Sequence, residues 1–309
     1  HLDVLLSRLD HNEKRPSWTD LLSAEFNKVM LNSNEEKNKS DDENVHSHNN
    51  CSDRYKKSNT LFNKATKYIP LASQTISKSY IQYPVGQSPL YLTHGNLGRV
   101  WDVDGNEYVD LVNGLLPIVL GYRDPDVDNA IMTQLSRGIS FSLSTELEIQ
   151  LSEELVKLIP SAEMVRLGKS GSDATTAAVR VARSFTGRER IAVCGYHGWH
   201  DWYIGTTSRN IGVPKCIAGL SHRFNYDDIH SLEELLEKHK GEFAAIIMEP
   251  VNSQIPKENY LQQVKELTHK HGALLIFDEI ITGFRISMGG AQEYFNVTPD
   301  LSCFGKAWV

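Results

Sequence analysis

The chain has 309 residues, 40% of them hydrophobic, and a formal net charge of −7. Its length allows two domains, or one large α/β domain with a tail. The negative charge disfavours general nucleic-acid binding, because such binding needs a surface rich in Lys and Arg. The sequence contains no apolar run of about 18 residues, so it predicts no membrane span. A small-molecule partner is therefore expected.

The four cysteines, Cys51, Cys194, Cys216 and Cys303, are widely spaced and form no Cys-x-x-Cys pair. This spacing indicates free thiols rather than a disulfide framework or a metal site. The N-terminus lacks the basic-then-apolar layout of a secretory signal. Together these features predict a cytoplasmic protein.

The first 60 residues differ from the rest of the chain in composition and in the pattern of apolar residues. Residues 1–30 carry apolar side chains at helical spacing and are interpreted as an upstream extension or the end of a preceding domain. Residues 31–60 are mostly Asn, Ser, Glu, Asp and Lys, too polar to offset the entropy of ordering, and predict a disordered linker. Such a linker suggests that the complete protein has a further, fused domain upstream.

Residues 61–309 have the alternating pattern of a folded α/β domain. Alternating strands around an Asp-Gly-Asn turn predict a hairpin over residues 100–111. Apolar periodicity predicts three helices, at 145–159, 173–186 and 256–272. Continuous apolar runs, typical of parallel strands buried on both faces, occupy 191–194, 244–248 and 273–277. The predicted architecture is a mostly parallel sheet covered by helices on both faces.

A phosphate-binding stretch is suggested ahead of the second of these helices. The sequence Gly-Lys-Ser resembles the end of a Walker A loop, but Glu163 stands where that loop needs its first glycine, which disfavours a nucleotide. Ser170, Gly171 and Ser172 precede the helix, where free N–H groups and the helix dipole attract an anion. An ordinary cap by Ser170 or Ser172 explains the same residues. These residues alone leave both interpretations open.

Two predicted strands are followed by acidic residues. Glu249 comes after the run 244–248, and Asp278 after the run 273–277. Ligands of open α/β sheets bind beyond the carboxyl ends of the strands, so Asp278 is expected to face a ligand site. A helix cap would explain Asp278 equally well. The weaker Glu249-Pro250 pair is adequately explained by a proline that ends a strand.

The final part of the chain carries a specific resemblance. The sequence of residues 278–306, DEIITGFRISMGGAQEYFNVTPDLSCFGK, closely resembles the core of class III aminotransferases, which use pyridoxal phosphate. Within that class it is most similar to the glutamate-1-semialdehyde 2,1-aminomutase group, through Gly-Phe-Arg, Gly-Gly-Ala-Gln and Thr-Pro-Asp-Leu. The resemblance extends back to about Leu61 through WDVDGNEYVDL, SGSDA, YHG and EPV in the same order. It implies the large domain of a fold type I enzyme, a homodimer, and amino transfer between a small-molecule donor and a carbonyl acceptor.

The resemblance also implies roles for individual residues. Lys306 would form the Schiff base with pyridoxal phosphate and move the proton, and Asp278 would keep the pyridine nitrogen protonated. Gly171 and Ser172 would hold the phosphate at the start of the helix, and Tyr196 would stack on the pyridine ring. These roles match the chemistry of the cofactor, which needs an amine, an acid partner and a phosphate cup.

The chain departs from the aminomutase pattern where that group contacts its substrate. Lys78 stands where the group carries an arginine that grips the substrate carboxylate, and lysine lacks the bidentate fork. Gly114 and Leu115 replace a serine and a tryptophan. We therefore expect an aminotransferase acting on a different carbonyl, such as a sugar-like or keto acid. The aminomutase reaction is the alternative.

Members of the family continue past the lysine with the rest of the large domain and a C-terminal small domain. This chain ends at Val309, three residues after Lys306, so we expect it to be a truncated form that lacks the small domain. A non-catalytic scaffold with the same fold is the alternative of another class. The presence of both Lys306 and Asp278 disfavours the scaffold.

Overall fold

The computed structural model describes residues 53–308. It divides into two compact units, one formed by residues 53–95 and 99–109, the other by residues 96–98 and 110–308. The predicted extension at residues 1–30 and most of the predicted linker at 31–60 lie outside the described residues, so both remain predictions.

The first unit begins with short helices. They are η1 (Asp53–Tyr55), α3 (Lys56–Ala65), η2 (Pro70–Ala72) and η3 (Ile76–Lys78). Helix α3 thus starts inside the range predicted as linker. The carboxylate of Asp104 accepts hydrogen bonds from the backbone N–H groups of Lys57 and Ser58, at 2.6 and 2.9 Å. This distant carboxylate supplies the acceptors that the first turn of α3 needs.

A three-stranded sheet completes the first unit, with strands β1 (Leu92–Asn96), β2 (Arg99–Asp102) and β3 (Glu107–Val109). Strands β2 and β3 pair antiparallel, with Val100 opposite Tyr108, which confirms the predicted hairpin. Asp102 is buried and closes the turn by accepting from the N–H groups of Asp104 and Asn106 and from the Tyr108 hydroxyl. The turn is therefore held by a buried carboxylate as well as by its glycine.

The second unit is built on a five-stranded sheet in the order β5-β4-β6-β7-β8, and every neighbouring pair is parallel. The strands are β4 (Arg190–Cys194), β5 (Ser221–Arg223), β6 (Phe243–Met248), β7 (Leu274–Glu279) and β8 (Leu301–Phe304). All six residues of β6 are buried, as expected for a central strand covered on both faces. The predicted fold class is confirmed, and the three predicted strands are β4, β6 and β7.

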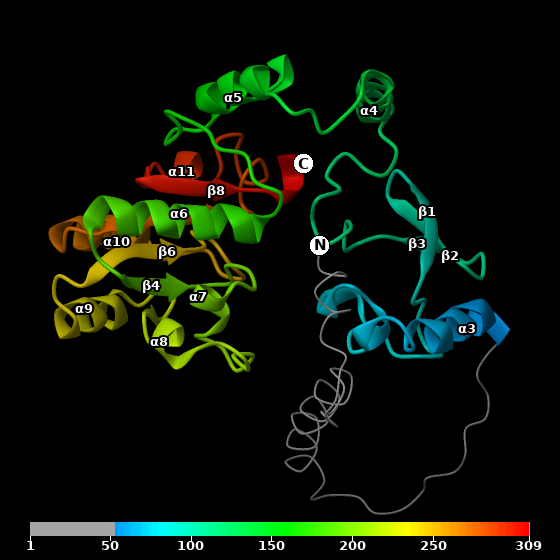
Figure 1. Ribbon diagram of the computed structural model, residues 1–309, viewed down its shortest axis with the longest axis horizontal. Helices are drawn as coiled ribbons and strands as arrows, with labels where there is room; N and C mark the ends of the chain where they lie inside the picture. Colours follow the sequence, from blue (N-terminus) through cyan, green and yellow to red (C-terminus); the bar gives the residue numbers. More distant parts are fainter. Residues whose placement is uncertain (1–52, 309) are drawn as a thin grey trace, which may run out of the picture. The chain divides into compact units, whose positions relative to one another are not determined.

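Helices cover both faces of this sheet (Figure 1). Helices α6 (Gly171–Thr186) and α7 (Asp201–Ile204) share one apolar cluster with the sheet, and α9 (Ile229–Lys238) and α10 (Tyr260–Lys270) share the other. Within β6, Ile247 belongs to the first cluster and Ile246 to the second, because successive side chains of a strand point to opposite faces. Burial of one such side chain stabilises the fold by about 1.5–3 kcal/mol.

The remaining helices are short or lie away from this core. They are α4 (Pro125–Arg137), α5 (Glu146–Leu158), α8 (Lys215–Ala218), α11 (Ala291–Tyr294) and η4 (Lys306–Trp308). Helix α5 matches the predicted helix at 145–159 and begins with a capping box formed by Thr145 and Glu148. The predicted crossover helix at 256–272 is α10, which starts only after Asn259, a residue with a left-handed φ of 62°.

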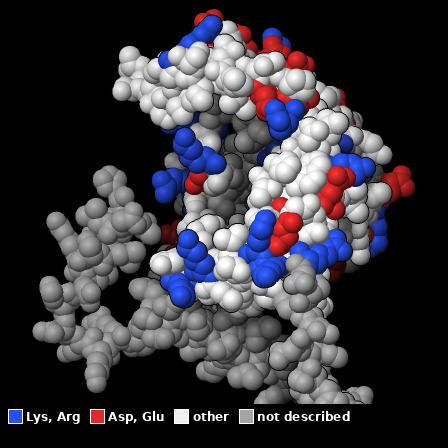
Figure 2. All heavy atoms as spheres, turned by 90° about the vertical axis from the view of Figure 1, so that its right-hand side faces the viewer, with Lys and Arg blue, Asp and Glu red and all other residues white. Residues whose placement is uncertain are grey.

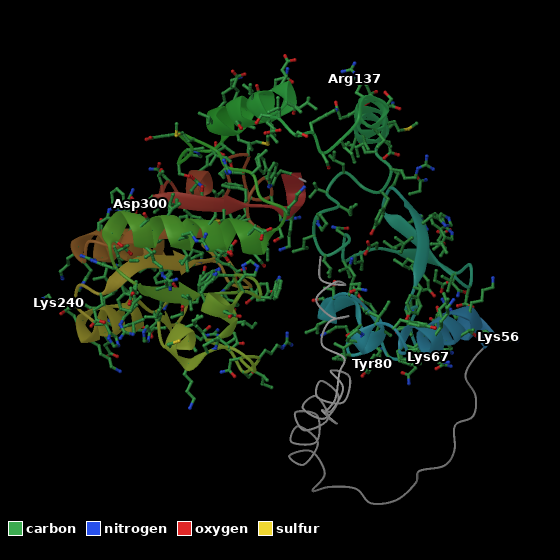
Figure 3. All side chains as sticks on the ribbon, viewed as in Figure 1. Lys56, Lys67, Tyr80, Arg137, Lys240 and Asp300 are labelled. Carbon is green, nitrogen blue, oxygen red and sulfur yellow. The ribbon has the colours of Figure 1, made fainter. Side chains whose placement is uncertain are left out.

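Charged residues occupy the surface and the edges of the sheet. On the face drawn in Figure 2, Lys and Arg side chains lie intermixed with Asp and Glu. Lys240 follows α9 and Asp300 precedes β8, so both lie at the amino edge of the sheet, as Figure 3 shows. Among the helices of the described residues, none has both the length and the apolar character needed to cross a membrane.

Candidate active site

Four neighbouring strands deliver polar residues to the carboxyl edge of the parallel sheet. After β4 come Tyr196 and His197, after β6 comes Glu249, and β7 ends with Asp278 and Glu279. Lys306 lies two residues beyond the end of β8. Because parallel strands end at one edge, residues far apart in the sequence reach the region where open α/β sheets bind ligands.

Asp278 is 3% exposed and is held on both carboxylate oxygens. Its Oδ2 lies 2.8 Å from Nδ1 of His197, and its Oδ1 accepts from the N–H of Ile280 at 3.2 Å. The other ring nitrogen of His197, Nε2, donates to the carbonyl oxygen of Cys194 at 3.1 Å. A carbonyl only accepts hydrogen bonds, so Nε2 carries a proton and the ring is fixed from both sides.

His197 was not predicted as a site residue. Its side chain is fully buried, and its ring packs nearly parallel to that of Trp202, with 6.3 Å between centroids. The sequence signal was present, because His197 lies in the same Tyr-His-Gly motif as Tyr196. Its partner Asp278 lies 81 positions away in the sequence, and only the sheet topology brings the two together.

Lys306 is half-buried and has a left-handed φ of 54°. Burial lowers the pKa of its amine below the ordinary value of 10.5. The negative charges of Asp278 and Glu249 oppose this shift of the pKa, and the positive charge of Arg285 adds to it. A lowered pKa increases the fraction of neutral amine, which is the form that acts as a nucleophile.

Glu249 is a second carboxylate at this edge. Its Oε2 accepts from the backbone N–H of Tyr196 at 3.1 Å, and a Cβ added at Gly195 would lie 2.5 Å from the same oxygen. Burial raises the pKa of Glu249, and the negative charge of Asp278 raises it further. The sequence interpretation explained Glu249 by the proline that follows it, whereas the structure places it among the charges that face Lys306.

The start of α6 fits closely between two other strand ends. A Cβ on Gly171 would lie 2.4 Å from Cδ1 of Ile280, and a Cβ on Gly198 would lie 2.3 Å from Oγ of Ser172. Gly198 also has a φ of +105°, a conformation that L side chains rarely adopt. The two glycines therefore allow the helix start, the end of β7 and the loop after β4 to approach one another.

The cap of α6 resolves one alternative that the sequence left open. Ser170 is the N-cap residue, and its Oγ accepts from the N–H of Asp173 at 3.3 Å. Ser172 is the second residue of the helix, and its hydroxyl makes no hydrogen bond within the part of the chain that the structure describes. The hydroxyl of Ser172 and the positive end of the helix therefore remain available to an anion.

Two other predicted site residues are placed as follows. Tyr196 is 60% exposed at the carboxyl edge, and its ring meets that of Tyr203 edge-on, with 5.6 Å between centroids. Lys78 is the exposed last residue of η3 and belongs to the first unit. The structure groups Lys306, Asp278, Gly171, Ser172 and Tyr196 in the second unit. Their individual roles, and that of Lys78, stay predictions.

The geometry fits pyridoxal phosphate. The cofactor needs an amine, a carboxylate for the pyridine nitrogen and a phosphate cup, and the second unit supplies a half-buried lysine, a buried aspartate and a glycine-lined helix start. A parallel sheet with these groups at its carboxyl edge is the arrangement of a fold type I pyridoxal-phosphate enzyme.

Comparison with known proteins gives the family. The family model described as aminotransferase class-III matches residues 80–309, and the chain belongs to this family. It is 45% identical to a 3-aminobutyryl-CoA aminotransferase of Cloacimonas acidaminovorans over 81% of the chain and 61% of that protein. It is 40% identical to a glutamate-1-semialdehyde 2,1-aminomutase of Desulforamulus reducens, over 82% and 61%.

A solved transaminase with pyridoxal phosphate bound is 28% identical, with a TM-score of 0.75 over 81% of this chain and 61% of that one. The family and this relative indicate pyridoxal phosphate as the cofactor. The chain spans about three fifths of the length of the curated relatives that it matches, 61% in both cases given above.

Proposed function

We propose that this chain is part of a pyridoxal-phosphate-dependent aminotransferase in which Lys306 carries the cofactor and Asp278 supports its pyridine nitrogen. The observation that carries the proposal is that a half-buried lysine of lowered pKa and a buried aspartate lie at the carboxyl ends of the neighbouring strands β8 and β7. The match of residues 80–309 to the class-III aminotransferase family supports the same assignment.

Pyridoxal phosphate supplies an electrophilic carbon and an electron sink for the carbanion at the substrate carbon. Lys306 Nζ is the group that takes and returns the proton, because its lowered pKa increases the fraction of neutral amine. Asp278, fixed by His197, presents a carboxylate that keeps a ring nitrogen protonated. Gly171 and Ser172 bind the phosphate, and the exposed ring of Tyr196 offers a stacking surface.

The test uses the full-length protein incubated with pyridoxal phosphate and then reduced with borohydride. Peptide mass spectrometry is expected to locate a phosphopyridoxyl group on Lys306. The adduct should be lost in Lys306→Ala and retained in Lys169→Ala, because Lys169 is exposed in the loop before α6. A folded wild-type protein without an adduct would refute the enzyme and favour the non-catalytic scaffold.

The substrate proposal is a β-amino acyl thioester as amino donor. Its support is the 45% identity to a protein named 3-aminobutyryl-CoA aminotransferase. The residues Lys78, Gly114 and Leu115 agree with a different substrate, because a lysine lacks the bidentate fork of the arginine and the other two replace a serine and a tryptophan. The second candidate is the aminomutase reaction, favoured by the 40% identity to a glutamate-1-semialdehyde 2,1-aminomutase.

The two reactions separate in one assay. Loaded full-length enzyme is supplied with 3-aminobutyryl-CoA and 2-oxoglutarate, or with glutamate-1-semialdehyde alone. Turnover of the first pair supports the thioester proposal, and conversion of the second to 5-aminolevulinate supports the aminomutase. Sugar-like and keto acids belong in the same screen as acceptors, because the sequence predicts them.

We further infer that the complete protein is a cytoplasmic homodimer. The described cysteines, Cys194, Cys216 and Cys303, are all free thiols, which suits a reducing compartment. Helix α4 exposes apolar side chains, including Met132 at 69% and Leu135 at 59%, which a second subunit would cover. Light scattering of the full-length protein tests the dimer, and a monomer at micromolar concentration would contradict it.

A further inference from the structure

The segment between β7 and α11, residues 280–290, is anchored at its base by Glu279. This carboxylate is 0% exposed and accepts from the hydroxyl of Thr282, from the N–H of Ala291 at 2.8 Å and from the N–H of Gln292 at 2.9 Å. A carboxylate satisfied by several fixed donors holds its surroundings rigidly. Glu279 therefore fixes both ends of the segment.

The segment packs against the end of β8, directly before Lys306. A Cβ on Gly283 would lie 2.3 Å from Cδ1 of Phe304, so only glycine fits at this position. The ring of Phe284 meets that of Phe304 edge-on, with 5.7 Å between centroids. These contacts fix the backbone on the N-terminal side of Arg285 beside the strand that leads to the lysine.

Arg285 connects this segment to another part of the second unit. Its Nε donates to the carbonyl oxygen of Ile281 at 2.9 Å, and its Nη2 donates to the carbonyl oxygen of Leu116. The side chain is half-buried. The guanidinium is planar with donors in a fixed fork, so the first hydrogen bond orients the second. Lysine keeps the charge but cannot reproduce this pair of bonds.

The turn that Arg285 reaches is conformationally strained. Four consecutive residues have positive φ angles: Asn113 at 51°, Gly114 at 62°, Leu115 at 70° and Leu116 at 80°. Each non-glycine residue in this region costs on the order of 1–2 kcal/mol. Such a conformation persists only where the surroundings hold it, so contacts from outside the turn are required.

Asp110 holds one side of this turn. Its carboxylate accepts from the N–H groups of Val112, Asn113 and Gly114 and from the hydroxyl of Tyr122 at 2.7 Å. Burial alone would raise the pKa of Asp110, but these hydrogen bonds outweigh it and lower the pKa. A cavity opens beside the turn, lined in part by Asp110, Asn113 and Tyr122. The opposite side, at the carbonyl of Leu116, is held by Arg285.

We propose that Arg285 is a positioning residue that fixes the strained turn 113–116 to the segment 280–290, which packs on the strand leading to Lys306, and thereby determines which substrates the site accepts. The turn contains Gly114 and Leu115, the two positions at which the chain departs from the aminomutase pattern. Only the part about substrate choice rests on the proposed function. The part about the turn rests on the hydrogen bonds and packing given above.

Hydrogen exchange followed by mass spectrometry tests the turn directly. The full-length protein is compared with Arg285→Lys, Arg285→Gln and the control Arg180→Gln, since Arg180 is exposed on α6 and makes no hydrogen bond in the described residues. The amides of Leu115 and Leu116, both bonded to the carbonyl oxygen of Val112 at 3.1 Å, should exchange about tenfold faster in both Arg285 variants. Unchanged exchange in Arg285→Lys would overturn the proposal.

Steady-state kinetics test the effect on substrate choice. In Arg285→Lys, KM should rise about tenfold for the preferred amino donor while kcat changes less than about threefold, because the turn binds rather than reacts. Equal effects on kcat and KM, or none on either, would refute this part. If the borohydride test finds no adduct, the proposed function fails, and hydrogen exchange alone decides the positioning role.

Discussion

Removal of the His197 ring should destabilise the second unit strongly. The ring is fully buried and contacts Asp278 Oδ2 at 2.8 Å and the carbonyl oxygen of Cys194 at 3.1 Å. In His197→Ala the Oδ2 of Asp278 loses its partner, the carbonyl oxygen of Cys194 keeps only the N–H of Glu249, at 3.1 Å, and a cavity opens beside Trp202. Removing the hydrogen-bond partner of a buried carboxylate costs about 3–5 kcal/mol, since the carboxylate stays buried without compensation. We expect a loss of this size in the free energy of unfolding.

A graded series separates the hydrogen bonds from the lost volume. His197→Asn retains one amide donor for one of the two acceptors, so its loss should be about 1–3 kcal/mol, the cost of a single unsatisfied buried group. His230→Ala is the control, because His230 is 85% exposed on α9, and its effect should stay within about 0.5 kcal/mol.

Urea unfolding followed by tryptophan fluorescence measures these losses, and the buried Trp202, stacked near His197, reports on the site itself. A loss below about 1 kcal/mol for His197→Ala would refute the reasoning, because a buried carboxylate oxygen left without a donor costs at least about that much. In the loaded enzyme, misorientation of Asp278 that costs about 1.4 kcal/mol of cofactor binding should raise the Kd for pyridoxal phosphate about tenfold.

Three further changes have defined outcomes. Gly171→Ala places a methyl group 2.4 Å from Cδ1 of Ile280 and should weaken phosphate binding and stability. The added change Ile280→Val removes that carbon and should restore both. Additive effects of the two substitutions in a double-mutant cycle would contradict the contact. His222 accepts from Arg190 at 2.6 Å, and burial, then the Arg190 charge, lower the pKa of His222. At pH values between that lowered pKa and about 6.5, His222 binds a proton more readily in the unfolded protein than in the folded one. The free energy of unfolding therefore falls as the pH drops through this range. His222→Gln should flatten the fall in urea titrations at pH 7.5 and 5.5, and identical pH profiles would exclude the effect. Ile247→Ala should cost about 2–5 kcal/mol by opening a core cavity, and a smaller loss in urea unfolding would indicate that the sheet collapses around it.

The sequence predicted the central architecture because its signals are local. The apolar runs at 244–248 and 273–277 identified β6 and β7 to within one or two residues, since strands buried on both faces have nearly continuous hydrophobic sequences. Strands β5 and β8 were not predicted. They are only three and four residues long and lie at the edges of the sheet, where Ser221 and Ser302 interrupt the apolar pattern.

The site residues that the sequence identified are also those with local signals, and the ones that it missed depend on distant partners. Asp278 and Lys306 were named because they begin and end one contiguous motif, residues 278–306, although their roles remain untested. His197, Glu249 and Arg285 acquire their importance from partners that lie 81, 53 and 169 positions away in the sequence. Such contacts depend on the order of strands and on loop paths, which the composition of one segment does not contain. A histidine three residues after a predicted strand was the one signal that was not used.

The same topology brings together the groups that raise and lower the pKa of Lys306. The parallel register places Asp278 opposite Cys303, three residues before Lys306, so the carboxylate and the amine share one buried edge. Glu249, on the other side of β7, raises the pKa of Lys306, while burial and Arg285 lower it. The neutral amine therefore depends on burial and on a cation that is itself tied to the turn at Leu116. A substitution that frees Arg285 should accordingly act mainly on the turn and on KM, because burial, the largest cause of the lowered pKa of Lys306, stays unchanged.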